Sequence, residues 1–290
     1  MILVAVIAII VAVLVFLIFA AYVGYRMVTP PRLIGKWSPR DFGFDYTDEE
    51  FSSENLKLKG WFIDRNSDLT IIPLHGYTVS RWDEVYMKDI IKILAEEGFN
   101  VFAFDFRAHG ESEGKHTTLG DKEIKDVMSA IDFLNEKYPE KCMKIGIIGY
   151  SMGGAIALKI AALENRVACA VADSPFVSME KTGPRGLKYF ANLPKSLYGI
   201  VKIFSSSIAK ANLKELEIIN YADKIKVPVL IIAGKRDPLV TVKEVEEFRE
   251  RAKDKVELWI TSAEHVRSIK DFPEEYKKKI VEFFRRNMSQ

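Results

Sequence analysis

Cysteine is scarce in this sequence, which has only Cys142 and Cys169 among its 290 residues. No CxxC pair and no Cys/His cluster surrounds either residue, which argues against a disulfide scaffold and against a cysteine-based zinc site. Both cysteines lie in or beside apolar runs that are typical of strands. We therefore predict that they are buried core thiols.

A marked excess of charge of one sign is also absent. The chain has 42 Lys and Arg residues against 40 Asp and Glu, a formal net charge of +2. So small a charge gives no electrostatic basis for binding nucleic acid or an acidic partner, and we predict no nucleic-acid partner. Hydrophobic residues make up 48% of the chain, ample for a core, and the length suits one large domain or two small ones.

Charged side chains are missing altogether from residues 2–25. This apolar run is long enough to cross a hydrocarbon core of about 30 Å. We predict that residues 1–25 form a retained transmembrane anchor, which makes the membrane a partner of this chain. The alternative is a cleaved signal peptide, with Ala20 and Ala21 near the cleavage site. A signal peptide usually has a basic n-region and an apolar run of about 7–15 residues, whereas this segment has no basic residue before it and a longer apolar run.

The residues after this run are basic, and no charged side chain precedes it. The four basic residues are Arg26, Arg32, Lys36 and Arg40. The positive-inside rule therefore favours a cytoplasmic position for the rest of the chain, with a secreted, anchored domain as the alternative. Thr29-Pro30-Pro31 ends the helix and begins a linker over residues 26–40. A chain shortened to begin near Pro31 is expected to be soluble, with unchanged turnover.

The rest of the chain, residues 41–290, alternates strand-like and helix-like segments. This alternation predicts an α/β fold with a mainly parallel eight-stranded sheet and helices on both faces. The expected strands are 42–46, 56–63, 70–74, 101–105, 144–148, 168–172, 229–233 and 256–260. The expected helices are 85–97, 121–137, 152–163, 242–252 and 274–286.

One stretch interrupts this rhythm. Residues 176–221 separate two expected strands by far more than a loop and one helix require. The stretch is rich in Leu, Tyr, Phe, Ile and Val, which predicts an inserted helical cap. Ordinary packing helices without the role of a lid are the alternative.

The strongest motif is Gly149-Tyr150-Ser151-Met152-Gly153, which follows an expected strand and precedes a helix of small residues. A G-x-S-x-G in this context is the nucleophile elbow, a tight turn that lifts the serine hydroxyl above the sheet edge. The flanking positions need glycine because any side chain would clash in so tight a turn. We predict Ser151 as the nucleophile.

A serine hydroxyl needs a base, and in this arrangement the chain order is serine, acid, histidine. Of the four histidines, only His265 follows Ser151, in the loop after the last expected strand. Asp237 follows the preceding strand, 28 residues before His265, and is the predicted acid. Asp173 is the rival acid, and we expect its role to be mainly structural.

Two backbone amides are the expected donors to the oxyanion of a tetrahedral intermediate. One belongs to Met152, the residue after the nucleophile. The other belongs to Tyr77, in the loop His75-Gly76-Tyr77 after an expected strand. His75 is expected to be a structural hydrogen-bonding residue, and the loop 104–114 to brace the site.

Together these residues closely resemble the α/β-hydrolase superfamily over roughly residues 41–287. The resemblance rests on His75-Gly76-Tyr77, the Asp105 to Ser112 loop, the Gly149 to Gly154 elbow, the Asp237 loop and His265. Within the superfamily the chain is similar to esterase and acyl-peptidase-like hydrolases with an N-terminal membrane segment, in which Asp-Ser/Cys-Pro-Phe also follows the sixth strand, here Asp173 to Phe176. Two positions depart from the common pattern, since Ala108 and Glu264 stand where glycine is usual.

The resemblance and the motifs predict hydrolysis of a carboxylic ester in two steps, with Ser151, Asp237 and His265 as the triad and no metal or organic cofactor. The apolar cap and the anchor favour a small-molecule or lipid-like acyl ester as substrate. A serine peptidase or an acyltransferase with the same triad is an alternative, and so is a catalytically silent, membrane-tethered binding module.

Overall fold

The computed structural model describes residues 1–288, and its centre is one eight-stranded sheet with the strand order β1-β2-β4-β3-β5-β6-β7-β8. The β1–β2 and β2–β4 pairs are antiparallel and all others are parallel, which confirms the predicted, mainly parallel sheet. The strands are β1 Thr47–Ser53, β2 Leu56–Ile63, β3 Leu69–Leu74, β4 Asn100–Phe104, β5 Lys144–Tyr150, β6 Val167–Asp173, β7 Val229–Gly234 and β8 Val256–Thr261.

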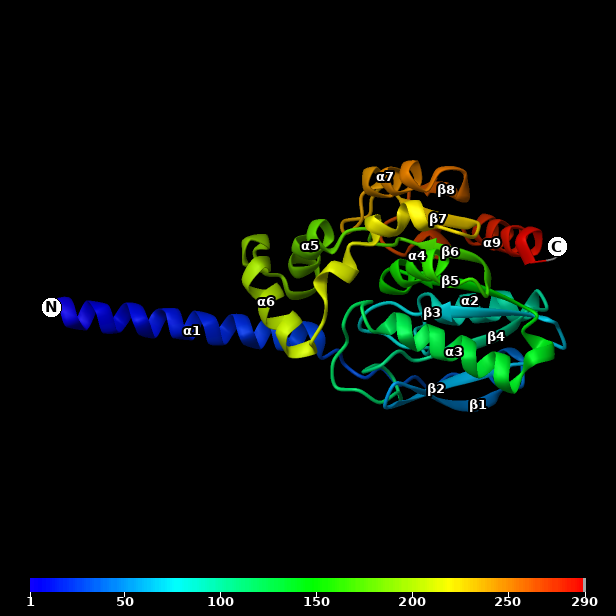
Figure 1. The fold of residues 1–290 in the computed structure, drawn as a ribbon, viewed down its shortest axis with the longest axis horizontal. Helices are drawn as coiled ribbons and strands as arrows, with labels where there is room; N and C mark the ends of the chain where they lie inside the picture. The colour runs from blue at the N-terminus through cyan, green and yellow to red at the C-terminus, as the bar shows by residue number, and fades with distance from the viewer. Residues whose placement is uncertain (289–290) are drawn as a thin grey trace.

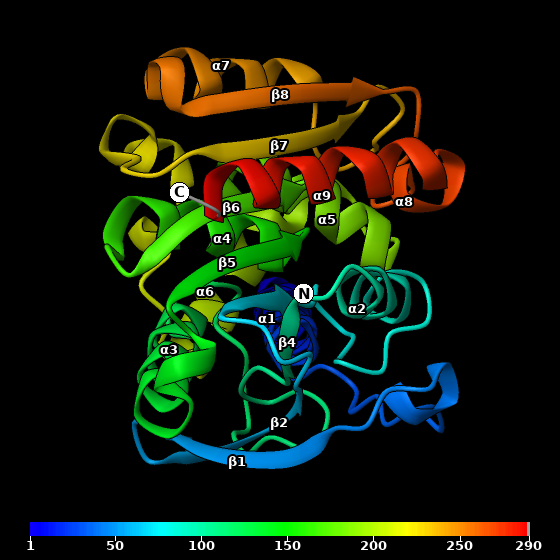
Figure 2. The same cartoon turned by 90° about the vertical axis from the view of Figure 1, so that its right-hand side faces the viewer.

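Helices cover both faces of the sheet, as Figure 2 shows. Side chains from α3, α4 and α7 join the core on one face, and side chains from α2, α8 and α9 join the core on the other. The central strands are therefore buried on both sides, which is why they are continuously apolar. The helices are α2 Met87–Glu96, α3 Glu123–Lys137, α4 Met152–Leu163, α7 Val242–Ala252, α8 Ser268–Asp271 and α9 Pro273–Met288, with short 3-10 turns at η2 Pro139–Lys141 and η6 Lys253–Lys255. Both cysteines are buried thiols, as predicted.

The predicted first strand, residues 42–46, is wrong. A capping box at Ser38, with proline next in the chain, starts the 3-10 turn η1 Pro39–Phe42, and Gly43 ends it in the left-handed region with φ +84°. The alternating aromatic residues after this turn pack on the core without forming a strand. The first strand is instead β1. Its acidic residues obscure the alternation of apolar and polar positions that would indicate a strand. Its inward-facing Glu49 is buried against the Lys137 ammonium and the Tyr138 hydroxyl.

The insertion between β6 and β7 is helical, and Figure 1 shows its two main helices between the sheet and the N-terminal helix. These are α5 Met179–Ala191 and α6 Tyr198–Ala209, followed by 3-10 turns. The turns are η3 Lys195–Leu197, η4 Leu213–Leu216 and η5 Ile218–Lys224. We call residues 176–221 the cap.

The N-terminal helix α1, Ile2–Val28, is longer than the predicted segment 1–25. It is long and apolar enough to cross a membrane, and its first part is exposed. Its last turns pack along the cap helix α6 (Figure 1). Contact is closest at Gly24, where a Cβ atom would lie 2.8 Å from the Phe204 Cβ. The helix thus has an exposed N-terminal part and a docked C-terminal part.

The expected linker is fastened to the domain as well. The Thr29 hydroxyl lies 3.0 Å from the His116 Nδ1, and the Arg32 guanidinium donates to the Gly114 carbonyl at 2.7 Å. Because these contacts follow α1 directly, they hold the end of the helix in a defined position on the domain.

Candidate active site

Ser151 stands between β5 and α4 in a strained turn. Its φ of +52° lies in the left-handed region, which a serine rarely adopts and which is common at functional sites. The turn requires glycine on both sides. A Cβ atom at Gly149 would lie 2.3 Å from the Gly153 carbonyl oxygen, and one at Gly153 would lie 2.2 Å from the Leu74 carbonyl oxygen. The predicted strand–turn–helix context is therefore present.

The three predicted triad residues lie together at the carboxyl ends of the parallel strands. His265 Nε2 is 3.0 Å from the Ser151 hydroxyl oxygen, and His265 Nδ1 is 2.7 Å from Asp237 Oδ2. The Asp237 side chain is 1% exposed and the His265 side chain 10% exposed. The hydrogen-bonded series is thus shielded from bulk water but open on the side of the serine.

The loop around Asp237 fixes the orientation of its carboxylate. Asp237 Oδ1 accepts hydrogen bonds from the Leu239 amide at 2.7 Å and the Val240 amide at 2.9 Å. Only Oδ2 then faces the imidazole. A carboxylate accepts hydrogen bonds and cannot donate them, so Nδ1 of His265 carries a proton and donates it to Asp237 Oδ2.

Asp173, the rival acid, lies at the end of β6 and has other partners. Its carboxylate accepts hydrogen bonds from the Ser174 hydroxyl at 2.9 Å and the Tyr276 hydroxyl at 3.0 Å. The Ser174 oxygen in turn accepts from the Val266 amide at 3.1 Å, next to the predicted base. Burial raises the pKa of Asp173 to about 6. Asp173 therefore supports the loop that carries His265 without contacting the imidazole.

Two backbone amides beside the serine are available as donors. Met152 begins α4, and Tyr77 lies in the loop after β3; both residues line the same cavity as Ser151. Neither amide meets a hydrogen-bond acceptor within residues 1–288. The close approach of Gly153 to the Leu74 and His75 carbonyls brings the Tyr77 loop against the elbow.

His75 is a structural residue in this arrangement. Its Nε2 accepts a hydrogen bond from the Phe106 amide at 3.0 Å, so the ring is neutral and its Nδ1 donates to the Gly76 carbonyl at 2.8 Å. Burial and the neighbouring His109 hold the pKa of His75 well below its ordinary value. A neutral ring with both nitrogens engaged braces the Tyr77 loop and takes no proton.

The loop after β4 is hydrogen-bonded to His75 and Arg81, on either side of Tyr77 in the chain. The buried Asp105 carboxylate accepts from the Arg81 amide at 2.8 Å and the Glu111 amide at 3.0 Å, and it pairs with the Arg81 guanidinium. Ala108, where glycine is usual, adopts φ +62°. Glu264, the other departure from the common pattern, is exposed.

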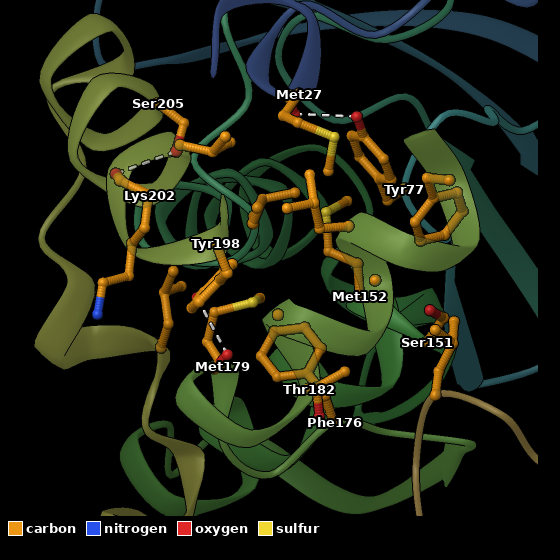
Figure 3. A pocket seen from close by; sticks show the side chains of 18 of the residues that line it. Met27, Tyr77, Ser151, Met152, Phe176, Met179, Thr182, Tyr198, Lys202 and Ser205 are labelled. Atoms are coloured by element: carbon orange, nitrogen blue, oxygen red, sulfur yellow. Dashed lines mark hydrogen bonds between the residues drawn. The ribbon is translucent and has the colours of Figure 1, made fainter. Parts of the chain in front are cut away.

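A cavity of about 100 Å³ opens above Ser151, between the elbow and the cap (Figure 3). Its walls are mostly apolar and include Phe176, Met179, Leu187 and Val201 from the cap. Met27, at the end of α1, also lines it. No pattern in the sequence predicts that α1 contributes to this cavity, because helical periodicity cannot show which distant surface a helix end meets.

Within residues 1–288, no group of three or more His, Cys, Asp or Glu side chains is arranged to hold a metal ion. The chemistry that the described residues support is nucleophilic. A serine hydroxyl, an imidazole and a buried carboxylate lie in series, beside two amides that have no acceptor among the described residues.

Comparison with known proteins agrees with the α/β fold and an esterase-like family. The model of the family described as serine aminopeptidase, S33, matches residues 65–216, which include Ser151 but end before Asp237. The structure of the Pyrococcus furiosus esterase Pf2001 is 51% identical, covers 89% of this chain and 99% of its own, and superposes with a TM-score of 0.80.

Two curated relatives are more distant. The uncharacterized protein YqkD of Bacillus subtilis is 29% identical over 80% of this chain and 76% of its own length. The monoglyceride lipase of Mus musculus is 31% identical over 41% of each chain. With the fold and the family match, these likenesses identify the chain as an esterase-like hydrolase of the α/β-hydrolase fold that belongs to the serine aminopeptidase S33 family.

Proposed function

We propose that this chain is a serine hydrolase that cleaves carboxylic esters through an acyl-enzyme on Ser151. The observation that carries the proposal is the series of hydrogen bonds from Asp237 through His265 to Ser151, which ends in an apolar cavity. A catalytically silent binding module would have no need to keep a strained serine within hydrogen-bond distance of an imidazole that a buried carboxylate orients.

In the proposed reaction, the Ser151 oxygen attacks the ester carbonyl carbon while His265 Nε2 takes the serine proton. The Asp237 carboxylate stabilises the imidazolium, and the Met152 and Tyr77 amides donate to the oxyanion. The C–O bond to the alcohol breaks as His265 returns the proton to the leaving oxygen. Water then attacks the acyl carbon while His265 Nε2 takes a proton from it. The bond between the acyl carbon and the Ser151 oxygen breaks as His265 returns the proton to Ser151, which releases the acid.

The cavity walls favour an acyl ester over an aminopeptide. An aminopeptidase must bind the ammonium group of its substrate, and none of the described lining residues is an Asp or a Glu. The charged lining residue Lys202 pairs with Glu180, and in Figure 3 its side chain points away from the cavity. The relatives named as an esterase and a monoglyceride lipase support the same choice.

A panel of substrates with matched leaving groups tests the proposal. We expect the purified chain to hydrolyse 4-nitrophenyl butanoate far faster than N-butanoyl or aminoacyl 4-nitroanilides, and Ser151→Ala to abolish this activity. Faster cleavage of the aminoacyl anilide would show a peptidase. Preferential transfer of the acyl group to an added alcohol would show an acyltransferase, and no turnover of any substrate would show a silent module.

We also propose that α1 is a retained membrane anchor. A signal peptide is removed and forms no part of the mature fold, whereas Ala20, Val23, Gly24 and Val28 are buried against the domain. We expect the full-length protein to resist extraction by carbonate and to keep its N-terminus. Recovery of a soluble protein that begins near Tyr22 would show cleavage. The proposed cytoplasmic position of the domain predicts digestion by protease only when the cytoplasmic side of the vesicles is exposed.

A further inference from the structure

A second cavity lies beside the one above Ser151, between α1 and the end of α5. It measures about 420 Å³. One wall is the last part of α1, and the other is the Tyr77 loop with Phe190, Ala191 and Leu193 of the cap. We call it the α1 groove. Most of its lining is apolar, and the triad chemistry described above makes no use of it.

The two cavities share three lining residues, Met27, Tyr77 and Phe190. The Tyr77 hydroxyl donates to the Met27 carbonyl at 2.9 Å, as Figure 3 shows, and the Tyr77 ring meets the Phe190 ring edge-on at 5.3 Å between centroids. One hydrogen bond and one aromatic contact thus hold together the side chains that separate the cavities. These three side chains therefore form the wall that the two cavities share.

The size of the cavity above Ser151 makes this connection important. An engineered apolar cavity of about 150 Å³ holds one benzene molecule. At about 100 Å³, the cavity beside Ser151 holds only a short acyl group. A long acyl chain must therefore continue elsewhere, and the α1 groove offers apolar space on the other side of Tyr77.

The groove also lies where a bilayer would meet the protein. Residues 2–19 of α1 precede its docked part and, at about 1.5 Å per residue, extend about 27 Å, close to the thickness of a hydrocarbon core. Phe19 ends this stretch and Tyr22 and Arg26 follow it, all at the level of the groove, the usual place of aromatic and basic residues at a membrane surface. The exposed Tyr189, Phe190 and Ile203 extend this apolar surface onto the cap.

We infer that the α1 groove takes the long acyl chain of a membrane-lipid ester, which passes from the bilayer along α1 and between Met27, Tyr77 and Phe190 to Ser151. The inference rests on the proposed serine hydrolase function and names its substrate class. The anchor thereby becomes one wall of the lipid path, in addition to holding the enzyme at the membrane.

The first experiment locates the chain directly in the unaltered, full-length protein in phosphatidylcholine vesicles. The probe is a hexadecyl fluorophosphonate with a diazirine at the end of its alkyl chain. It should label Ser151 and, on irradiation, crosslink to residues 19–31 or to Leu193. Crosslinks to Leu213 or Leu216, which line the first cavity and not the α1 groove, would overturn the inference. Failure to label Ser151 would instead contradict the proposed function.

The second experiment fills the groove. Ala191→Trp places a large side chain in it, and Ser207→Trp is the matched control, because Ser207 is an exposed cap residue that lines neither cavity. The rates of hydrolysis of 4-nitrophenyl hexadecanoate in the vesicles and 4-nitrophenyl butanoate in water are compared. Ala191→Trp should lower the hexadecanoate-to-butanoate ratio at least about tenfold, the effect expected when an apolar subsite is blocked. The control should keep the ratio, and an unchanged ratio in Ala191→Trp would overturn the inference.

Discussion

Replacement of Asp237 by asparagine tests the geometry of the triad in detail, because the structure dictates how the new amide must lie. The Leu239 and Val240 amides both donate to Oδ1 of Asp237, so the asparagine oxygen must take that position. Its NH₂ group then faces His265 Nδ1, 2.7 Å from the Oδ2 that it replaces. The NH₂ group donates, so Nδ1 must accept, and the proton moves to Nε2.

An imidazole with its proton on Nε2 cannot take the proton of Ser151. We therefore expect Asp237→Asn to lower kcat on 4-nitrophenyl butanoate by about 10⁴-fold, the effect of the wrong tautomer in a comparable triad. The fold should be kept, because the amide is nearly isosteric with the carboxylate. Circular dichroism and the melting temperature of the variant provide that control.

Asp173→Asn is the matched comparison at the rival acid. An asparagine there keeps an oxygen for the Tyr276 hydroxyl and directs its NH₂ toward the Ser174 oxygen, which can accept it. The tautomer of His265 is unaffected, so we expect kcat to fall by less than about tenfold. If Asp173→Asn is the more damaging of the two substitutions, Asp173 is the acid and the reasoning from the hydrogen bonds is refuted.

Three further predictions concern stability and the N-terminal helix. The pKa of Asp173 is raised to about 6 in the fold, so its ionisation destabilises the fold as pH rises from about 4 to 6. Asp173→Asn should therefore gain stability relative to wild type across this interval, by up to about 3 kcal/mol, and melting temperatures that differ by the same amount at pH 4 and pH 7 would contradict this. Gly24→Val should displace α1 from α6, because even a Cβ atom at this position would lie 2.9 Å from the Ser205 amide nitrogen. Limited proteolysis between α1 and the domain should then become faster, and an unchanged rate of digestion would contradict the docked position of α1. A chain beginning at Pro31 loses Met27 from the cavity wall and the acceptor of the Tyr77 hydroxyl, so we expect kcat on the butanoate ester to stay within about threefold while KM rises. An unchanged KM would contradict a role of Met27 in binding the substrate.

Much of the fold could be predicted from local patterns. Buried parallel strands such as β5 and β7 are continuously apolar, and helix α3 shows a clear 3.6-residue period, so their positions are evident in the sequence. The error at residues 42–46 has a physical cause. Alternating aromatic residues imitate a strand, while the true edge strand β1 carries charges and buries Glu49 through an ion pair with a residue distant in sequence.

The site, like the fold, has one part that local sequence patterns predict and another that depends on contacts between distant segments. The Ser151 elbow is local in the chain, and His265 is the only histidine after Ser151, so the proximity of Ser151, Asp237 and His265 could be predicted. The choice of Asp237 over Asp173 rested on strand order, and hydrogen-bond directions give it a physical reason. The place of Met27 in the cavity and the docking of α1 on α6 depend on contacts between segments far apart in the sequence, which no local pattern encodes.

The central claim, that His265 activates Ser151 as a nucleophile, is tested most directly by the rate and site of labelling with a small fluorophosphonate. Mass spectrometry of the digested protein should find the adduct on the peptide that contains Ser151. His265→Gln should slow the labelling by several orders of magnitude without unfolding the chain. An adduct on another serine, or labelling of the His265→Gln variant at the wild-type rate, would contradict the account.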